Sequence, residues 1–342
     1  MDAESLNLPR WPAAPSGGFH EVWFVSASDP GTGVGLWLRY TVDVGPHGRT
    51  CAVWGCWFDR DHPERCIALK NEVDAAAIGR TGVDLGGGNV LSEAGCRGEV
   101  EGAGHSLRWR LSFGQGAAPE EVVPSWLSPV ARLRGSGYAL PRPATTVTGA
   151  VEVDGRMIDL QRMPAGQAHY WGRSRWPSWA WARCSAFAED PGASVDLLEV
   201  EGPFGVRVPL FTFRFRGQVH RFGELPWIAF STSRAFAPVW HFAAEDAQLA
   251  IDGVVHAAPG QMVQVSYADA LHCANTEIAG MEVRVRTRAL PGAALRPEIT
   301  LTSKCAASLE FCGRTPDLRV TRGLVAVPAV QKKGPAAGSV AS

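Results

Sequence analysis

The chain has 342 residues, of which 46% are hydrophobic and 20% are charged. A disordered chain carries more charge and less apolar material, so this composition predicts a folded protein with sizeable cores, and the length favours two domains. The formal net charge of -1 gives no electrostatic reason to expect nucleic acid or an anionic membrane surface as a partner.

Targeting signals are not visible in the first residues. Residues 1–12 lack the basic start and apolar run of a secretory signal. No segment approaches the ~20 consecutive apolar residues that span a bilayer. We therefore expect a soluble cytoplasmic protein of undetermined oligomeric state, and a peripheral membrane contact for substrate uptake stays open.

Hydrophobic residues recur with a period of two, which predicts antiparallel β-strands. In residues 36–44, apolar Leu36 and Tyr40 alternate with polar residues such as Arg39, the pattern of a half-buried strand. The same period recurs in residues 107–113, 211–216 and 281–288. Helical spacing is scarce, and the one candidate is residues 71–78.

Turn residues separate the predicted strands. Asp154-Gly155 and Asp252-Gly253 each separate two short apolar segments. Both dipeptides predict a two-residue hairpin turn because glycine accepts a positive φ. Many short strands joined by such turns favour a barrel or sandwich over a parallel sheet. Residues 323–342, rich in Ala, Pro, Gly and Ser, predict a flexible tail.

An internal repeat supports two copies of one β unit. An aromatic segment around Trp23 leads into the turn Asp29-Pro-Gly, and an aromatic segment around Trp179 leads into Asp190-Pro-Gly. A further strand follows in each copy. The repeat predicts tandem domains over residues 15–165 and 166–322.

The eight cysteines are dispersed and form no Cys-x-x-Cys pair. This spacing argues against a zinc ribbon and against a redox dithiol. We expect ordinary buried thiols, and we predict no metal site and no cofactor.

Aromatic residues are densest in residues 169–182, where five of fourteen are aromatic and four of those are Trp. If residues 179–187 form a strand, Trp179, Trp181 and Phe187 share one face opposite small residues. A packed core is one reading of this cluster. Arginines such as Arg175 are awkward in a dry core but natural at the wet mouth of a barrel, which favours a role in lining a ligand site.

At these residues the sequence resembles a known group of proteins. Residues 147–155, His169-Tyr-Trp-Gly172 and Trp179-Ala-Trp181 are similar to the linker and signature of bacterial carotenoid hydratases, tocopherol cyclases and related lipocalin-like proteins, an architecture shared with several fungal Diels-Alderases. The resemblance implies an all-β fold of two tandem lipocalin-like antiparallel β-barrel domains. It also implies a pocket for a large apolar terpenoid, carotenoid, steroid or polyketide.

The resemblance further implies catalytic residues. In the hydratases the histidine and tryptophan of this signature act with an aspartate on the following strand, which a tyrosine precedes by two residues. His169 and Trp171 match the first pair and Asp196 falls near the expected place. Ser194 stands where the tyrosine would be, and this departure weakens the case for hydration while leaving a proton donor.

The chemistry can be stated from the residues alone. Protonating an alkene requires a strong acid, and a carboxyl group in apolar surroundings, such as Asp196, stays protonated because desolvation disfavours its anion. His169 could position that acid or take the proton back. The alternatives are a solvent-facing Asp196 and a His169 that is simply a satisfied hydrogen-bonding residue at a domain junction.

The predicted ligand contacts are seven residues, six of them aromatic: Tyr170, Trp171, Trp176, Trp179, Trp181, Phe213 and His272. The other reading of His272 is a hairpin-loop residue, and the spacing argues against zinc there because no third ligand falls at a familiar distance along the chain.

Three functions are compatible with these patterns. The first is a cofactor-free cyclase, hydratase or pericyclase acting on an apolar small molecule. The second is a non-catalytic carrier of such a molecule. The third is a carbohydrate-binding protein, in which the indoles would form a flat surface strip instead of lining a cavity.

Overall fold

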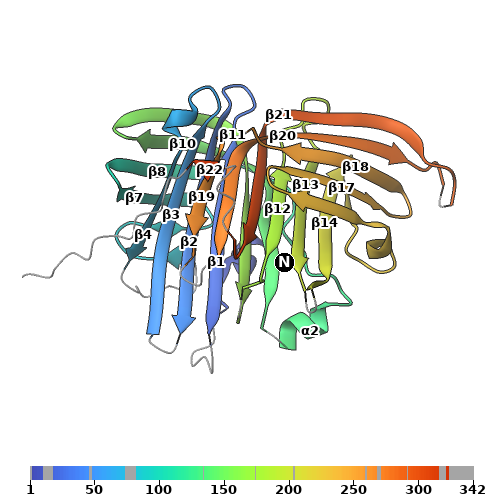
Figure 1. Cartoon of the computed structure of the whole chain (residues 1–342), viewed down its shortest axis with the longest axis horizontal. Helices are drawn as coiled ribbons and strands as arrows, with labels where there is room; N and C mark the ends of the chain where they lie inside the picture. The colour runs from blue at the N-terminus through green and yellow to red at the C-terminus, as the bar shows by residue number, and fades with distance from the viewer. Residues whose placement is uncertain are drawn as a thin grey trace, which may run out of the picture.

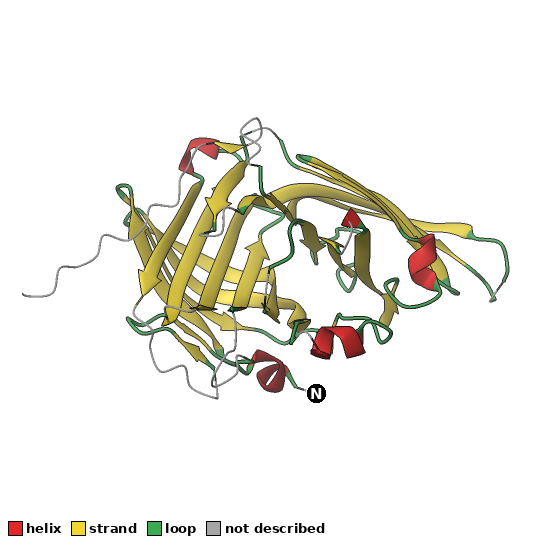
Figure 2. Cartoon of the chain, turned by 60° about the horizontal axis from the view of Figure 1, so that its bottom comes forward, coloured by secondary structure: helices red, strands yellow, loops and turns green. Residues whose placement is uncertain are grey.

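Two curved antiparallel sheets make up nearly all of the computed structural model (Figures 1 and 2). The all-β prediction of two tandem lipocalin-like units is confirmed. The structure describes residues 2–10, 18–45, 48–73, 82–133, 135–173, 175–202, 205–258, 260–267, 271–290, 292–315 and 321–322. The predicted tail and most of the candidate helix at residues 71–78 lie outside the described residues.

The first sheet has the strand order β4-β3-β2-β1-β11-β10-β8-β7-β6-β5, with β9 paired to β10. Its strands are β1 (Phe19–Ser28), β2 (Val34–Gly45), β3 (Gly48–Asp59), β4 (Ile67–Val73), β5 (Val83–Asp84), β6 (Val90–Leu91), β7 (Gly95–Gly102), β8 (His105–Phe113), β9 (Glu120–Glu121), β10 (Gly137–Val153) and β11 (Arg156–Gly172). Pairing of β1 with β11 brings the start of this unit beside its end.

The second sheet has the order β15-β14-β13-β12-β21-β20-β18-β17-β16, and β19 pairs with β20 and β22. Its strands are β12 (Trp179–Cys184), β13 (Ser194–Glu201), β14 (Arg207–Phe215), β15 (Gln218–Arg221), β16 (Thr232–Phe236), β17 (Val239–Glu245), β18 (Leu249–His256), β19 (Met262–Ser266), β20 (His272–Thr287), β21 (Arg296–Gly313) and β22 (Thr321–Arg322).

Helices are few and short in the described part of the chain. They are α1 (Ala3–Asn7), α2 (Ser128–Leu133) and the 3₁₀ turns η1 (Pro63–Arg65) and η3 (Trp227–Phe230). None of them combines the length and apolar character that crossing a membrane requires.

The predicted repeat is visible in the turns that follow the first strand of each sheet. Asp29 Oδ1 accepts a hydrogen bond from Gly31 N at 2.8 Å between β1 and β2, and Asp190 Oδ1 accepts one from Gly192 N at 2.9 Å between β12 and β13. In the first sheet β11 ends at Gly172, and in the second sheet β12 begins at Trp179. The domain boundary expected at 165/166 therefore falls inside β11, which stays in the first sheet to its last residue.

One of the two predicted hairpin turns is confirmed and the other is wrong. Asp154 and Gly155 join β10 to β11 with φ of 50° and 78°. Asp252 and Gly253 instead lie within the continuous strand β18. A Cβ at Gly253 would stand 2.6 Å from the ring of Phe242, so this glycine permits close packing of β17 on β18 and makes no turn.

The sheets pack on each other, so strands near the centre are buried on both faces (Figure 1). The half-buried prediction for β2 is wrong for this reason: Tyr40 faces the core of the first unit, while Trp37 and Arg39 are buried against the second. Ser28 Oγ donates to the carbonyl oxygen of Glu277 on β20 at 2.6 Å across the junction. This junction positions the candidate site.

The cysteine prediction needs one correction. Register pairs β20 with β21 so that Cys273 lies directly opposite Cys312, and the two form a disulfide. The remaining six cysteines are buried thiols, as expected: Cys51, Cys56, Cys66, Cys96, Cys184 and Cys305.

Candidate functional site

A cavity lies between the two sheets, where β1 and β2 face β12 and β13. Its volume of about 70 Å³ has room for a few water molecules. Eight of the side chains that line it are aromatic, and they come from both halves of the molecule: Phe24, Trp37, Tyr138, Tyr170, Trp176, Trp179, Trp181 and Tyr267. The cavity is therefore enclosed largely by rings, in contrast to the flat strip expected of a sugar-binding surface.

Four of the predicted ligand contacts meet at this cavity: Tyr170, Trp176, Trp179 and Trp181. Trp179 and Trp181 point into it from β12 because alternate residues of a strand share a face, while Ala180 and Ala182 face the core of the second unit. The ring of Phe24 meets that of Trp181 edge to face at 5.2 Å between centroids, which joins the walls contributed by the two sheets.

Asp196 lies immediately behind this wall. It is 2% exposed, and its carboxylate accepts hydrogen bonds from the hydroxyl of Tyr138 at 3.3 Å and from Nε1 of Trp181 at 3.4 Å. Burial raises the pKa of Asp196 to about 6, although the nearby guanidinium groups of Arg183 and Arg214 pull that pKa down. About a tenth of this carboxyl is therefore protonated at pH 7 and about half at pH 6, far more than for an ordinary aspartate, which suits a general acid.

Tyr138 connects Asp196 to the cavity. Its side chain lines the cavity, while its hydroxyl reaches the carboxylate. Burial, together with the charge of Asp196, raises the pKa of Tyr138 well above its usual value, so the phenol keeps its proton. The tyrosine that the resemblance expects at position 194 is absent, and the phenol beside Asp196 comes from β10 of the other sheet.

The mouth of the cavity is polar. Arg175 Nη2 donates to Asp43 Oδ1 at 2.7 Å, and His20 Nδ1 lies 2.8 Å both from Arg175 Nη2 and from Asp43 Oδ1. Burial lowers the pKa of His20 to about 4, against the opposing effect of its hydrogen bond to Asp43. His20 is therefore neutral at physiological pH, and Arg175 carries the positive charge at this end.

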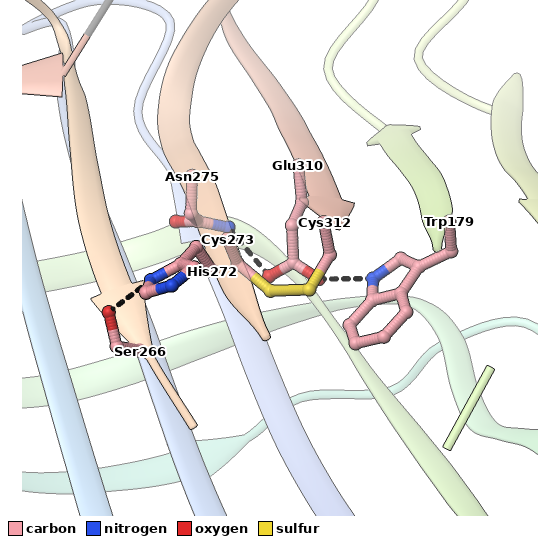
Figure 3. The surroundings of a disulfide bond; sticks show 7 residues. All are labelled: Trp179, Ser266, His272, Cys273, Asn275, Glu310 and Cys312. Atoms are coloured by element: carbon pink, nitrogen blue, oxygen red, sulfur yellow. Dashed lines mark hydrogen bonds between the residues drawn. A yellow bond between two sulfur atoms is a disulfide. The ribbon is translucent and has the colours of Figure 1, made fainter. Parts of the chain in front are cut away.

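A second carboxylate, Glu310, also lines the cavity, and Figure 3 shows its surroundings. Glu310 accepts a hydrogen bond from Nε1 of Trp179 at 2.6 Å and one from Nδ2 of Asn275 at 3.4 Å. The Cys273–Cys312 disulfide lies beside these residues and ties β20 to β21 behind the wall (Figure 3).

His169 lies away from the cavity, inside the first unit. Its Nδ1 is 2.6 Å from the carbonyl oxygen of Leu6 and its Nε2 is 2.8 Å from Glu21, and its ring stacks on Trp23 with 4.6 Å between centroids. Both ring nitrogens have partners and both side chains of the His169–Glu21 pair are fully buried. The structure therefore does not bring His169 together with Asp196 at the cavity.

The other predicted site residues are dispersed. Trp171 lines a separate surface pocket of about 510 Å³, which shares only Tyr138 with the aromatic cavity. Phe213 is fully buried in the core of the second unit, on the opposite face of its sheet from Asp196. His272 begins β20, where its Nδ1 meets Ser266 Oγ at 2.8 Å, away from the cavity (Figure 3). Phe187, expected to share a face with Trp181, packs in the second core because β12 ends at Cys184.

Sequence reasoning missed Tyr138, Phe24, Trp37 and Arg39. One signal was available in the predicted strand at residues 36–44, since a tryptophan beside an arginine on the polar face is unusual for a solvated surface. Within the described residues, no three His, Cys, Asp or Glu side chains gather closely enough to hold a metal ion.

Sequence comparison identifies the family. The profile of the tocopherol cyclase-like family matches residues 106–313, which is more than half of the chain, and the protein belongs to that family. The uncharacterized protein Rv0493c of Mycobacterium tuberculosis is 25% identical over 297 residues, covering 84% of this chain and 87% of the relative. A protein of a second strain of that species matches to the same extent.

Comparison with solved structures gives matches at low sequence identity. A putative AttH from Nitrosomonas europaea superposes with a TM-score of 0.50 at 11% identity, covering 86% of this chain and 92% of that one. Kievitone hydratase from Nectria haematococca gives a TM-score of 0.47 at 11% identity, with 91% of each chain covered. CghA with Sch210972 gives 0.49 at 11% identity, covering 92% and 93%.

Proposed function

We propose that this protein is an enzyme of the cyclase or hydratase type that protonates a carbon–carbon double bond of an apolar ligand held between the two sheets. The proposal rests on one observation above the others. A buried carboxyl group, Asp196, has a pKa raised to about 6 and is joined through Tyr138 to a cavity walled by aromatic rings. Membership of the tocopherol cyclase-like family supports the same class of reaction.

The proton passes through two groups of this chain. When Asp196 is protonated, its carboxyl O–H donates to Tyr138 Oη, the reverse of the hydrogen bond that the ionised carboxylate accepts. Tyr138 then gives its hydroxyl proton to the alkene carbon as it takes the proton of Asp196, so the phenol is restored and the carboxylate is left ionised. The resulting carbocation is stabilised by the faces of rings such as Phe24 and Trp181, at about 2 kcal/mol per desolvated ring. An internal hydroxyl then closes a ring, or water adds, and the proton released from that oxygen returns to Asp196.

The free space sets a condition on the ligand. The cavity of about 70 Å³ is smaller than the several hundred Å³ that sites for larger molecules enclose, so a terpenoid or polyketide has to displace side chains as it binds. Trp176, which is only partly buried and lies on the connection between the sheets, is the side chain best placed to move. The neighbouring pocket beyond Tyr138 offers further room.

Deuterium incorporation tests the proposal. The purified protein is incubated in D₂O with a panel of prenylated hydroquinones and linear terpenoids, and the products are analysed by mass spectrometry. An acid-initiated cyclisation places one deuterium on the carbon that is protonated, and Asp196→Asn should lose that product. Recovery of every ligand unchanged, despite measurable binding, would assign the protein as a carrier instead.

A further inference from the structure

The polar atoms of one cavity wall are not all satisfied. Arg39 is 6% exposed and lines the cavity, yet its Nε and Nη1 have no hydrogen-bond partner. Trp37, two residues earlier on the same face of β2, is fully buried, and its Nε1 also has no partner. Buried donors are nearly always hydrogen-bonded, because leaving one unpaired costs a large part of its hydration free energy.

The neighbours of Arg39 leave Nε and Nη1 without an acceptor in the structure. Its guanidinium carbon lies 4.4 Å from the ring centroid of Trp37, 5.2 Å from that of Tyr267 and 5.8 Å from that of Phe24, so rings surround it on three sides. Glu310, a carboxylate that also lines the cavity, accepts hydrogen bonds from Trp179 and Asn275 and none from Nε or Nη1 of Arg39. Rings attract the cation but do not replace oxygen acceptors.

From this arrangement we infer that Arg39 and Trp37 form a head-group site, which binds an acceptor oxygen on an otherwise apolar ligand. The oxygen belongs to a carbonyl, a phenol or a carboxylate, since each can accept from both donors. This deepens the proposed function, because it names a substrate class for the same cavity: an apolar molecule with one oxygenated end.

The position of the head-group site also orients the ligand. Arg39 contacts the ring of Phe24, Phe24 meets Trp181, and Trp181 donates to Asp196. A ligand with its oxygen at Arg39 therefore extends its apolar part along these rings toward Tyr138 and the acid. The double bond that is protonated lies away from the oxygenated end.

Binding of small matched probes tests the inference without turnover. Toluene, acetophenone and benzoate have the same ring and differ in having no acceptor, a carbonyl oxygen or a carboxylate. Isothermal titration calorimetry on the full chain should show that at least one of the two oxygenated probes binds ten times more tightly than toluene or better. The probe with the greater advantage distinguishes a neutral from an anionic head group.

Variants separate the donors from the rest of the cavity. Arg39→Met should remove the preference for the oxygenated probe while keeping toluene binding, and Trp37→Phe, which retains a ring, should reduce the preference about threefold or more. Asp196→Asn should leave the preference unchanged, so the head-group site survives even if no reaction is found. Should Arg39→Met fail to fold, Trp37→Phe decides alone.

Three results would overturn the inference. They are equal affinity for toluene and both oxygenated probes, an undiminished preference in folded Arg39→Met or Trp37→Phe, and no binding of any probe at millimolar concentration to the folded wild-type chain.

Discussion

Two buried acidic groups, Glu21 in the first unit and Asp196 at the junction between the sheets, differ in how completely their hydrogen bonds are satisfied. In the first unit, His169 and Glu21 have no exposed surface, and both nitrogens of the imidazole have partners. At the junction between the sheets, Asp196 keeps a raised pKa beside an aromatic cavity, with only long hydrogen bonds from Tyr138 and Trp181. The first arrangement is typical of a structural pair, and the second is typical of a group held ready for proton transfer.

The difference shows why the signature residues need a structure for their interpretation. His169 and Asp196 lie on different sheets, and the strand alternation that directs Tyr170 toward the cavity directs His169 away from it. A buried histidine near an aromatic cluster therefore has no necessary role in chemistry at that cluster. The comparison makes separate predictions for turnover and for stability.

The largest expected effect is on turnover in Asp196→Asn. Removing the proton donor should lower kcat by about 10²–10⁴-fold, the usual range for losing a general acid. Stability at pH 7 should stay equal or rise by up to about 3 kcal/mol, because raising the carboxyl pKa from 3.8 to about 6 costs the native state about 1.4 kcal/mol per pKa unit. Glu199→Gln, a change at a buried carboxylate of the same strand that pairs with Arg207, is the matched control and should keep kcat.

His169→Ala is expected to lower stability and to leave turnover nearly unchanged. Removing His169 takes the ion-pair partner from the buried carboxyl of Glu21, to which only the backbone N–H of Arg10 is then seen to donate, and this costs about 3–5 kcal/mol of folding free energy. Urea unfolding measures this loss, and kcat per folded molecule should change little. A variant with normal stability and lost turnover would show that His169 acts in catalysis, which contradicts the structural role given to it here.

The disulfide should contribute a smaller amount to stability. Cys273→Ser with Cys312→Ser should lower the free energy of unfolding by about 2–4 kcal/mol, mainly because the link restricts the unfolded chain. Reductant should lower the Tm of the wild type and leave that of the double variant unchanged. Thiol titration of the unfolded, unreduced wild type should count six free cysteines, and a count of eight would contradict the pairing.

The mildest effect is the dependence of activity and stability on pH. Catalysis needs the protonated carboxyl, so kcat should fall about tenfold per pH unit above about 6. The native state binds more protons at Asp196 than the unfolded state between pH 3.8 and about 6, so this group's contribution to stability decreases as pH rises through that window. His20, with its pKa lowered to about 4, acts in the opposite sense between about pH 4 and 6.5.

The strands were predictable because hydrophobic alternation is a local property of the chain. Alternation alone did not reveal which face of a strand meets which layer, so Phe213 was expected at the ligand although its face fills the second core. The pairing of Cys273 with Cys312 depends on the register of β20 and β21, which no local pattern encodes. The prediction for Asp252-Gly253 failed because a glycine that permits close strand packing has the same sequence signature as a turn.

Some residues of the cavity could be predicted from local sequence patterns and others could not. Trp179 and Trp181 were visible as a cluster on one short segment. Tyr138 and Arg39 are far from that segment in sequence and reach the cavity only because the two sheets pack face to face. Sites between domains are assembled by tertiary contacts, and local patterns give only one of their walls.

The ionisation of Asp196 tests the account most directly. With aspartate labelled by ¹³C at the carboxyl carbon, the resonance that disappears in Asp196→Asn can be followed by NMR from pH 3 to pH 9. The account predicts a midpoint near 6, well above the ordinary 3.8 of an aspartate. A midpoint at or below 3.8 would show a carboxylate that is ionised throughout, and the proposed proton donor would be contradicted.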